Sequence, residues 1–183
     1  MHSMTASFLR SAHGGESQAH MRYMAWADVA EKEGFCKVGK LFRAVAFAEQ
    51  VHATNHFVVL KDVKGAFLVD AMAGFGIGRT QENLASALEG ETFEINEMYP
   101  AYLSTAQAQG EKSAERSIHW ALETEKEHAK LFERAGQAVA KGQDLDIKSL
   151  YVCKVCGYTH EGDAPDKCPL CGAPKAKIET FGC

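Results

Sequence analysis

Proline is scarce in this sequence, with four among 183 residues, and only Pro100 occurs before residue 141. No apolar run approaches the ~20 residues that a membrane-spanning helix needs. The first residues also lack the continuous apolar segment of a signal peptide. No block of basic residues occurs, and the formal net charge is −4. These absences argue against a membrane protein, an exported protein and a nucleic-acid-binding protein.

The cysteines are few but unevenly placed. Four of the six lie in two C-x-x-C pairs near the end of the chain: Cys153, Cys156, Cys168 and Cys171. This spacing is typical of an intracellular metal site rather than of disulfides. Tetrahedral four-sulfur sites suit both zinc and iron, so the spacing alone leaves the metal open. The other two, Cys36 and Cys183, are interpreted as idle thiols, and we expect a reducing cytoplasm.

Residues 1–141 favour helix, because they are rich in alanine, glutamate, methionine, leucine and lysine. Glycines at 34 and 110 mark short turns, so the helices on either side of each turn should be antiparallel. The segment "GAFLVDAMAGFGIGRT" is long enough to run the length of a bundle. The expected fold is all-α, a ferritin-like four-helix bundle with one long crossover. The four expected helices cover residues 16–32, 36–63, 81–109 and 113–142.

The composition changes after Gly142, where a short polar linker leads into the cysteine pairs. A segment of about 40 residues is too small to hold a core without its metal. We therefore expect two domains: a bundle over residues 1–145 and a small rubredoxin-like metal domain over residues 146–183.

Carboxylates and histidines fall on the apolar stripes of the helices, where side chains are normally buried. Burying an unpaired carboxylate is costly, and a bound cation would compensate it. A Glu from each of two helices plus Glu-x-x-His from each of two others is the arrangement of di-iron carboxylate bundles. The second and fourth helices carry the motifs Glu49–His52 and Glu125–His128, and the other two carry Glu16, Glu94 and Glu97.

In this order, the motifs resemble those of the rubrerythrins: "GES" followed by "RY", Glu-x-x-His-Ala, "INEMYP", a second Glu-x-x-His-Ala, and "YVCKVCGY…CPLCGAPK". The resemblance implies a peroxidase that reduces hydrogen peroxide at a non-haem di-iron site, in defence against oxidative stress. It implies that electrons derived from NAD(P)H arrive from a separate reductase through the rubredoxin-type iron. It also implies a homodimer in which that iron can serve the partner chain's site.

The resemblance also assigns residues. The implied di-iron ligands are Glu16, Glu49, His52, Glu94, Glu97, Glu125 and His128. His52 and Glu97 are implied to exchange as ligands of one iron between redox states, and Tyr23 and Tyr102 to lie near the site. Each tyrosine hydroxyl could donate protons or simply bond a ligand carboxylate. His20 departs from the family, which usually has a long basic residue there.

Iron suits the four-cysteine site better than zinc, because a di-iron enzyme must be re-reduced one electron at a time. Zinc can still occupy the site in recombinant material. Gly157 and Gly172 are expected to let backbone amides approach the sulfurs. Pro100 is expected to bend or loosen the third helix just past Glu97. Two other functions remain open: a ferroxidase of the ferritin class, and a scaffold with a zinc ribbon.

Overall fold

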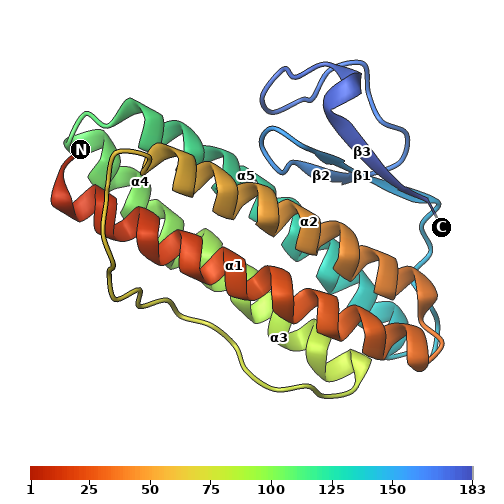
Figure 1. Ribbon diagram of the computed structural model, residues 1–183. Coiled ribbons are helices and arrows are strands. Elements are labelled where there is room, and N and C mark those ends of the chain that lie inside the picture. Colours follow the sequence, from red (N-terminus) through yellow and green to blue (C-terminus); the bar gives the residue numbers. More distant parts are fainter. Residues whose placement is uncertain (183) are drawn as a thin grey trace.

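The computed structural model, which describes residues 1–182, is a helical bundle with a small three-stranded domain beside it (Figure 1). The third helix of the bundle is built from three consecutive pieces, α3, a π-helix and α4. The expected four-helix bundle with one long crossover is confirmed. The helices are α1 (Ser3–Lys32), α2 (Cys36–Val59), α3 (Thr80–Phe93), the π-helix (Glu94–Met98), α4 (Tyr99–Ala108) and α5 (Lys112–Val139).

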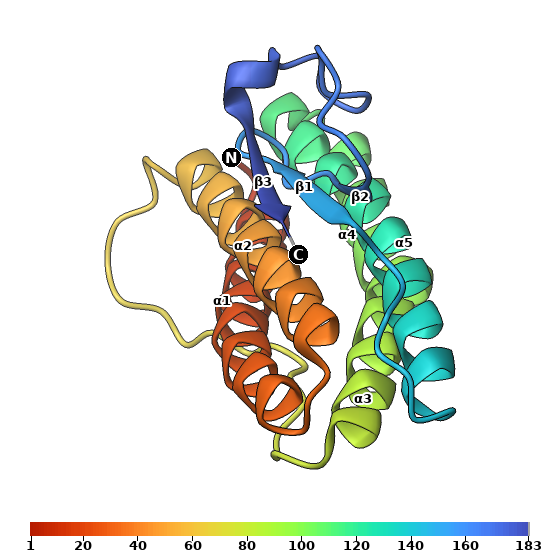
Figure 2. The same ribbon diagram turned by 90° about the vertical axis from the view of Figure 1, so that its right-hand side faces the viewer.

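The crossover, residues 60–79, forms neither helix nor strand and runs along the outside of α1 (Figures 1 and 2). Side chains of Ser11, Gln18 and Trp26 on α1 donate hydrogen bonds to its backbone carbonyls, at 2.6, 2.7 and 3.0 Å. A Cβ on Gly14 would lie 2.6 Å from Cγ1 of Val69. The glycine in α1 therefore allows the crossover to pass close to the helix.

The first helix begins at Ser3, earlier than the expected start at residue 16. The helix thus continues through two adjacent glycines, Gly14 and Gly15, which are poor helix formers. Leu9 and Ala12 are fully buried in a cluster with side chains of α4 and α5. This burial offsets the local cost of the glycines.

Pro100 distorts the third helix, as expected. The π-helix Glu94–Met98 ends two residues before it. Proline has no N–H to donate to the carbonyl of Asn96, so the regular helical ladder cannot continue there. π-Helical turns within α-helices occur frequently at functional sites.

A layer of buried polar side chains divides the core of the bundle into two apolar clusters. One cluster contains Trp26, Phe42 and Phe132, and the other contains Leu9 and Ile118. Along α1, α2 and α5 the chain passes from one cluster to the other, and buried glutamates or histidines lie between them. A polar layer in this position needs a compensating charge.

The C-terminal domain is an antiparallel sheet in the order β2-β1-β3, lying over α2 and α5 (Figure 2). The linker packs on the bundle, because Leu145 and Ile147 are buried in its larger apolar cluster. The domain boundary at residue 145 stays a prediction. The strands are β1 (Ser149–Cys153), β2 (Thr159–Glu161) and β3 (Ile178–Gly182), with a 3-10 turn at Lys175–Lys177.

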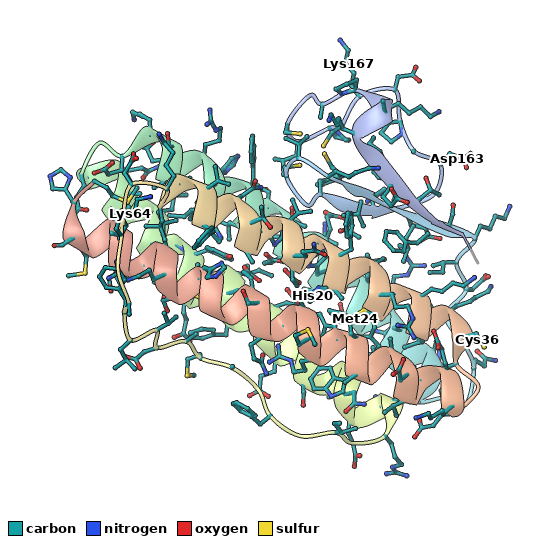
Figure 3. The ribbon with its side chains drawn as sticks, viewed as in Figure 1. His20, Met24, Cys36, Lys64, Asp163 and Lys167 are labelled. Carbon is teal, nitrogen blue, oxygen red and sulfur yellow. The ribbon has the colours of Figure 1, made fainter. Side chains whose placement is uncertain are left out.

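Two remaining expectations concern thiols and membranes. Cys36 is exposed at the start of α2 (Figure 3). Cys183 lies outside the described residues. Among residues 1–182, no helix is both long and apolar enough to cross a membrane.

Candidate metal centres

Six buried side chains from α1, α2, α3 and α5 bring their ligand atoms together in the polar layer. They form two groups, and within each group the ligand atoms lie within 4.8 Å of one another. Glu49 and Glu125 belong to both groups, so they lie between two positions at which a cation could bind. The groups are Glu16, Glu49, His52 and Glu125, and Glu49, Glu91, Glu125 and His128.

Both histidines turn Nδ1 toward the carboxylates. Nδ1 of His52 lies 2.9 Å from an oxygen of Glu125 and 3.0 Å from one of Glu49. Nδ1 of His128 lies 2.7 Å from the other oxygen of Glu125. The opposite nitrogen of His128, Nε2, lies 3.1 Å from the Thr159 hydroxyl in the C-terminal domain. The two rings therefore connect the carboxylates with that domain.

The cluster fits a pair of iron ions. Within the described residues, one oxygen each of Glu16 and Glu91 is buried without a hydrogen-bond partner, and the two oxygens of Glu125 have no partner besides their ion-pair contacts with the histidine Nδ1 atoms. Such unsatisfied groups are rare in native structures and costly unless they bind something. Carboxylate and imidazole ligands from four helices suit iron.

Without metal, the site holds protons at neutral pH. Burial and the charge of Glu49 raise the pKa of Glu91 to about 8. Burial alone would lower the pKa of His52, but Glu125 and Glu49 outweigh it and raise that pKa to about 9. Metal ligands must give up their protons on binding.

We therefore expect metal binding at neutral pH to release protons from the cluster. The release should fall as the pH rises through about 8 and then about 9, because Glu91 and His52 then lose their protons before the metal arrives. An anaerobic Fe²⁺ titration in a pH-stat measures it, on full-length chain whose four-cysteine site is already loaded. A proton release that stays constant up to and beyond these values would contradict the assignment.

The structure brings Glu91, rather than Glu97, to the cluster. Glu97 is exposed on the π-helix, whereas Glu91 is buried. Two residues six apart are separated by about 120° around an α-helix, so they do not share one face. The expectation that Glu97 is a ligand that exchanges with His52 is corrected here. On α3, the buried residues Leu84, Ala87 and Glu91 follow one another at spacings of three and four, so they share one helical face. This spacing is visible in the sequence and could have identified Glu91 as a buried residue.

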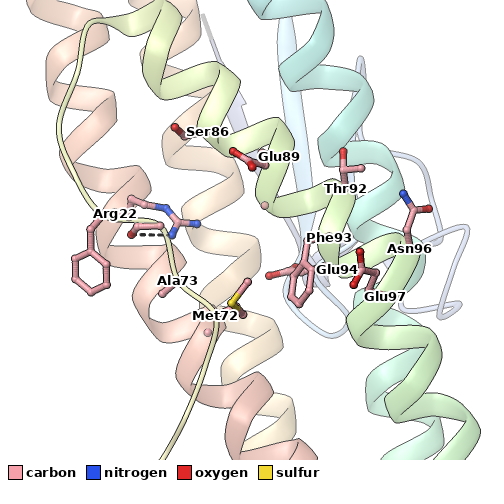
Figure 4. Close-up of a pocket in the computed structure, with 14 residues that line it drawn as sticks. Arg22, Met72, Ala73, Ser86, Glu89, Thr92, Phe93, Glu94, Asn96 and Glu97 are labelled. Atoms are coloured by element: carbon pink, nitrogen blue, oxygen red, sulfur yellow. Dashed lines mark hydrogen bonds between the residues drawn. The ribbon is translucent and has the colours of Figure 1, made fainter.

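Glu94 lies between the cluster and a pocket. It is half-buried, and burial together with the charge of Glu125 raises its pKa well above the usual range. The pocket encloses about 610 Å³ between the crossover and the third helix. Figure 4 shows Glu94 and Glu97 on one side of it and Arg22 and Met72 on the other.

Two tyrosine hydroxyls reach the cluster. That of Tyr23, as expected, donates a hydrogen bond to Glu91 at 2.6 Å. The second belongs to Tyr99, whose hydroxyl donates to Glu16. Tyr102, the expected second tyrosine, instead bonds a serine hydroxyl on α1 at 3.1 Å and stacks on a phenylalanine. The structure therefore replaces Tyr102 by Tyr99.

His20 stays outside both groups. Its Nδ1 lies 2.7 Å from the backbone carbonyl of Ala46 on α2, and it bridges the two helices (Figure 3).

The four cysteines form the second candidate centre. Sγ of Cys153 lies 3.6 Å from that of Cys171, and the same distance separates Cys156 and Cys168. A disulfide needs ~2.05 Å. A tetrahedron with metal–sulfur bonds of ~2.3 Å has edges of ~3.8 Å, so the four sulfurs fit one metal ion.

The glycines after each pair have positive φ, +83° at Gly157 and +75° at Gly172. Their amides donate to the carbonyl oxygens of Cys153 and Cys168, at 2.8 and 2.9 Å, and close the turns. Backbone amides approach the sulfur of Cys153, as expected, and they come from Val155 and Cys156. A side-chain hydrogen bond from Cys156, with backbone amides of the same turn, lowers the pKa of Cys153 to about 5.

The C-terminal domain contacts the bundle of its own chain on the histidine side of the cluster. Gly157 faces Nε2 of His52 so closely that a Cβ at that position would overlap the ring. The hydroxyl of Thr159 lies within hydrogen-bond distance of Nε2 of His128, at 3.1 Å. One turn of the four-cysteine site therefore touches both histidines.

Comparison with known proteins agrees with this geometry. The family model for rubrerythrin matches residues 7–136, and that for the rubrerythrin rubredoxin-like domain matches residues 151–179. The chain is 48% identical to Rubrerythrin-2 of Clostridium acetobutylicum, over 97% of each chain. It is 32% identical to rubrerythrin of Nitratidesulfovibrio vulgaris, over 98% of this chain and 95% of that one. A structure of fully reduced, all-ferrous nigerythrin superposes with a TM-score of 0.84 at 29% identity, covering 97% of this chain and 86% of that one.

Proposed function

This chain belongs to the rubrerythrin family, and on that premise we propose that it is a non-haem di-iron peroxidase that reduces hydrogen peroxide to water. One observation carries the proposal: a buried carboxylate–histidine cluster with unsatisfied oxygens touches a four-cysteine site through both of its histidines. Bound iron would supply the two electrons that peroxide takes up. Two protons complete the reaction and yield two water molecules.

Iron held by the four cysteines would pass electrons to the cluster. The shortest protein route leads from the turn at Gly157 and Thr159 to His52 and His128, within one chain. Cys171 is only half-buried, so this side of the site remains accessible to a donor protein. The donor is a separate reductase that uses NAD(P)H.

The pocket beside Glu94 gives peroxide access to the cluster. Its lining combines carboxylates, Arg22 and apolar side chains such as Phe93. Arg22 is held by Gln18 and by the carbonyl of Gly74 at 2.6 and 3.2 Å, so its guanidinium does not neutralise the Glu94 carboxylate by a direct ion pair. Glu94 is therefore free to turn toward a cation in the cluster.

Tyr99 supplies a proton to the departing oxygen, because its hydroxyl already points at the cluster through Glu16. We expect Tyr99→Phe to slow peroxide reduction by roughly 100-fold, the lower range of general acid catalysis. Tyr102→Phe is the matched control, since its hydroxyl bonds only Ser11. Peroxide consumption by reduced, iron-loaded chains measures the effect. Equal losses in the two variants would contradict the role of Tyr99.

The alternative function is a ferroxidase of the ferritin class, which would use the same cluster to oxidise and store iron. Iron counting separates the two. A peroxidase keeps three iron ions per chain and oxidises them with one peroxide per two electrons. A ferroxidase takes up iron beyond the four-cysteine and carboxylate sites when Fe²⁺ and oxidant are supplied in excess.

The proposal includes a homodimer and a cytoplasmic location. Large apolar side chains are exposed along the crossover, among them Leu68, Met72, Phe75 and Ile77. A cluster of exposed apolar side chains commonly marks a protein interface. A reducing compartment suits the four cysteines, because thiolates bind iron only while they stay reduced. Mass measurement of the Phe75→Asp chain against wild type tests the dimer.

A further inference from the structure

A buried histidine, His56, lies next to the cluster but outside both groups of candidate ligands. It is fully buried on α2, one turn beyond His52. Burial lowers its pKa to about 3, with a further contribution from the charge of His52, so the ring is neutral at ordinary pH. A buried neutral imidazole needs one donor and one acceptor as partners.

Both ring nitrogens of His56 have partners. The hydroxyl of Ser117 on α5 lies 2.9 Å from Nδ1, and the hydroxyl of Tyr99 lies 3.2 Å from Nε2. Tyr99 in turn bonds Glu16. Four buried side chains from four different elements thus form one continuous row of hydrogen bonds: Ser117, His56, Tyr99 and Glu16.

The positions of the protons in this row follow from counting. Tyr99 has one proton and gives it to Glu16, so its oxygen can only accept from His56. His56 therefore carries its single proton on Nε2, which leaves Nδ1 bare. Nδ1 must then accept from Ser117. Every donor in the row points toward Glu16.

We propose that His56 is a positioning residue of the peroxidase site, which holds the Tyr99 hydroxyl proton toward Glu16 by donating its own Nε2–H to the Tyr99 oxygen. The inference rests on the proposed function. Its Nε2–H keeps donating to the Tyr99 oxygen and stabilises the charge left there when the hydroxyl proton is given to the departing oxygen, and a proton from water then restores the hydroxyl. Ser117 holds the ring in this tautomer by donating to Nδ1.

The tautomer of His56 tests the geometry without any turnover. Nitrogen-15 NMR of the full-length, zinc-loaded chain distinguishes a bare Nδ1 from a protonated one, with His56→Gln used to assign the signal. We expect the proton on Nε2. A proton on Nδ1 would reverse the row and overturn the proposal.

The kinetic test compares two substitutions of the same histidine. His56→Leu fills the space but gives Tyr99 no donor, whereas His56→Gln keeps an amide N–H for that oxygen. We expect His56→Leu to slow peroxide reduction by roughly tenfold or more and to change the solvent deuterium isotope effect. His56→Gln should restore most of the rate. Iron content should match wild type in both.

Two results would overturn the role of His56. One is a His56→Leu chain with the wild-type rate and isotope effect. The other is a His56→Gln chain as slow as His56→Leu, which would show that the ring only fills space. A wild-type chain that binds iron but leaves peroxide intact would instead overturn the proposed function, and this role with it, whatever the tautomer.

Discussion

Gly157→Ala should slow the peroxide-driven reoxidation of the four-cysteine iron by roughly 10–100-fold, while leaving both metal sites occupied. The added Cβ would overlap the His52 ring, so the C-terminal domain must move away from the histidines. Displacements near 1 Å can cost a reaction about 100-fold when geometry matters. Stopped-flow absorbance of the four-cysteine iron measures the rate.

Gly172→Ala is the matched control. Gly172 follows the second cysteine pair as Gly157 follows the first, and its φ of +75° is close to the +83° of Gly157. Both substitutions carry the ~1–2 kcal/mol cost of a left-handed residue with a side chain. A Cβ on Gly172, however, meets nothing within 4 Å. If both variants reoxidised at the same rate, the contact with His52 would have no part in electron transfer.

Glu91→Gln should cost the carboxylate site at least about 100-fold in metal affinity. Loss of a residue that only supports a metal ligand typically lowers metal affinity 10–100-fold. Glu91 itself offers a ligand atom to one of the two groups, so its loss should cost more. The amide keeps the shape of the side chain but removes its charge. Competition of the loaded chain against a coloured chelator measures the affinity, with the four-cysteine site as an internal reference.

Glu97→Gln provides the comparison, because Glu97 is an exposed carboxylate of the same third helix. It should bind metal as wild type does. The reverse pattern, with affinity lost in Glu97→Gln and kept in Glu91→Gln, would restore the assignment suggested by the motif "INEMYP".

Features with a local spacing rule could be predicted from the sequence. Two side chains three residues apart share a helical face, which was enough for both Glu-x-x-His motifs. The cysteine pairs are recognisable for the same reason. The bundle followed from the glycine turns and the long crossover, which are also local features.

Features that depend on helical phase or on distant contacts could not be predicted. Glu91, Glu94 and Glu97 repeat every three residues, and such a repeat drifts around a helix of 3.6 residues per turn. The motif drew attention to the last two, while the buried stripe of α3 selects the first. The same uncertainty about helical phase led to the prediction of Tyr102, rather than Tyr99, near the cluster.

The sequence contains no pattern that indicates contacts between segments far apart in the chain. Gly157 was expected to serve its own turn, and only the structure shows it against His52. The role of His56 likewise depends on other helices, because its partners Ser117 and Tyr99 lie on α5 and α4.

The most direct test of the account is anaerobic stopped-flow mixing of the fully reduced, iron-loaded chain with hydrogen peroxide. The account predicts that the colour of the oxidised four-cysteine iron returns rapidly, with two electrons lost per peroxide consumed. If the carboxylate site oxidised while the four-cysteine iron stayed bleached, the two centres would not be connected for turnover. The ferroxidase function would then describe this chain better.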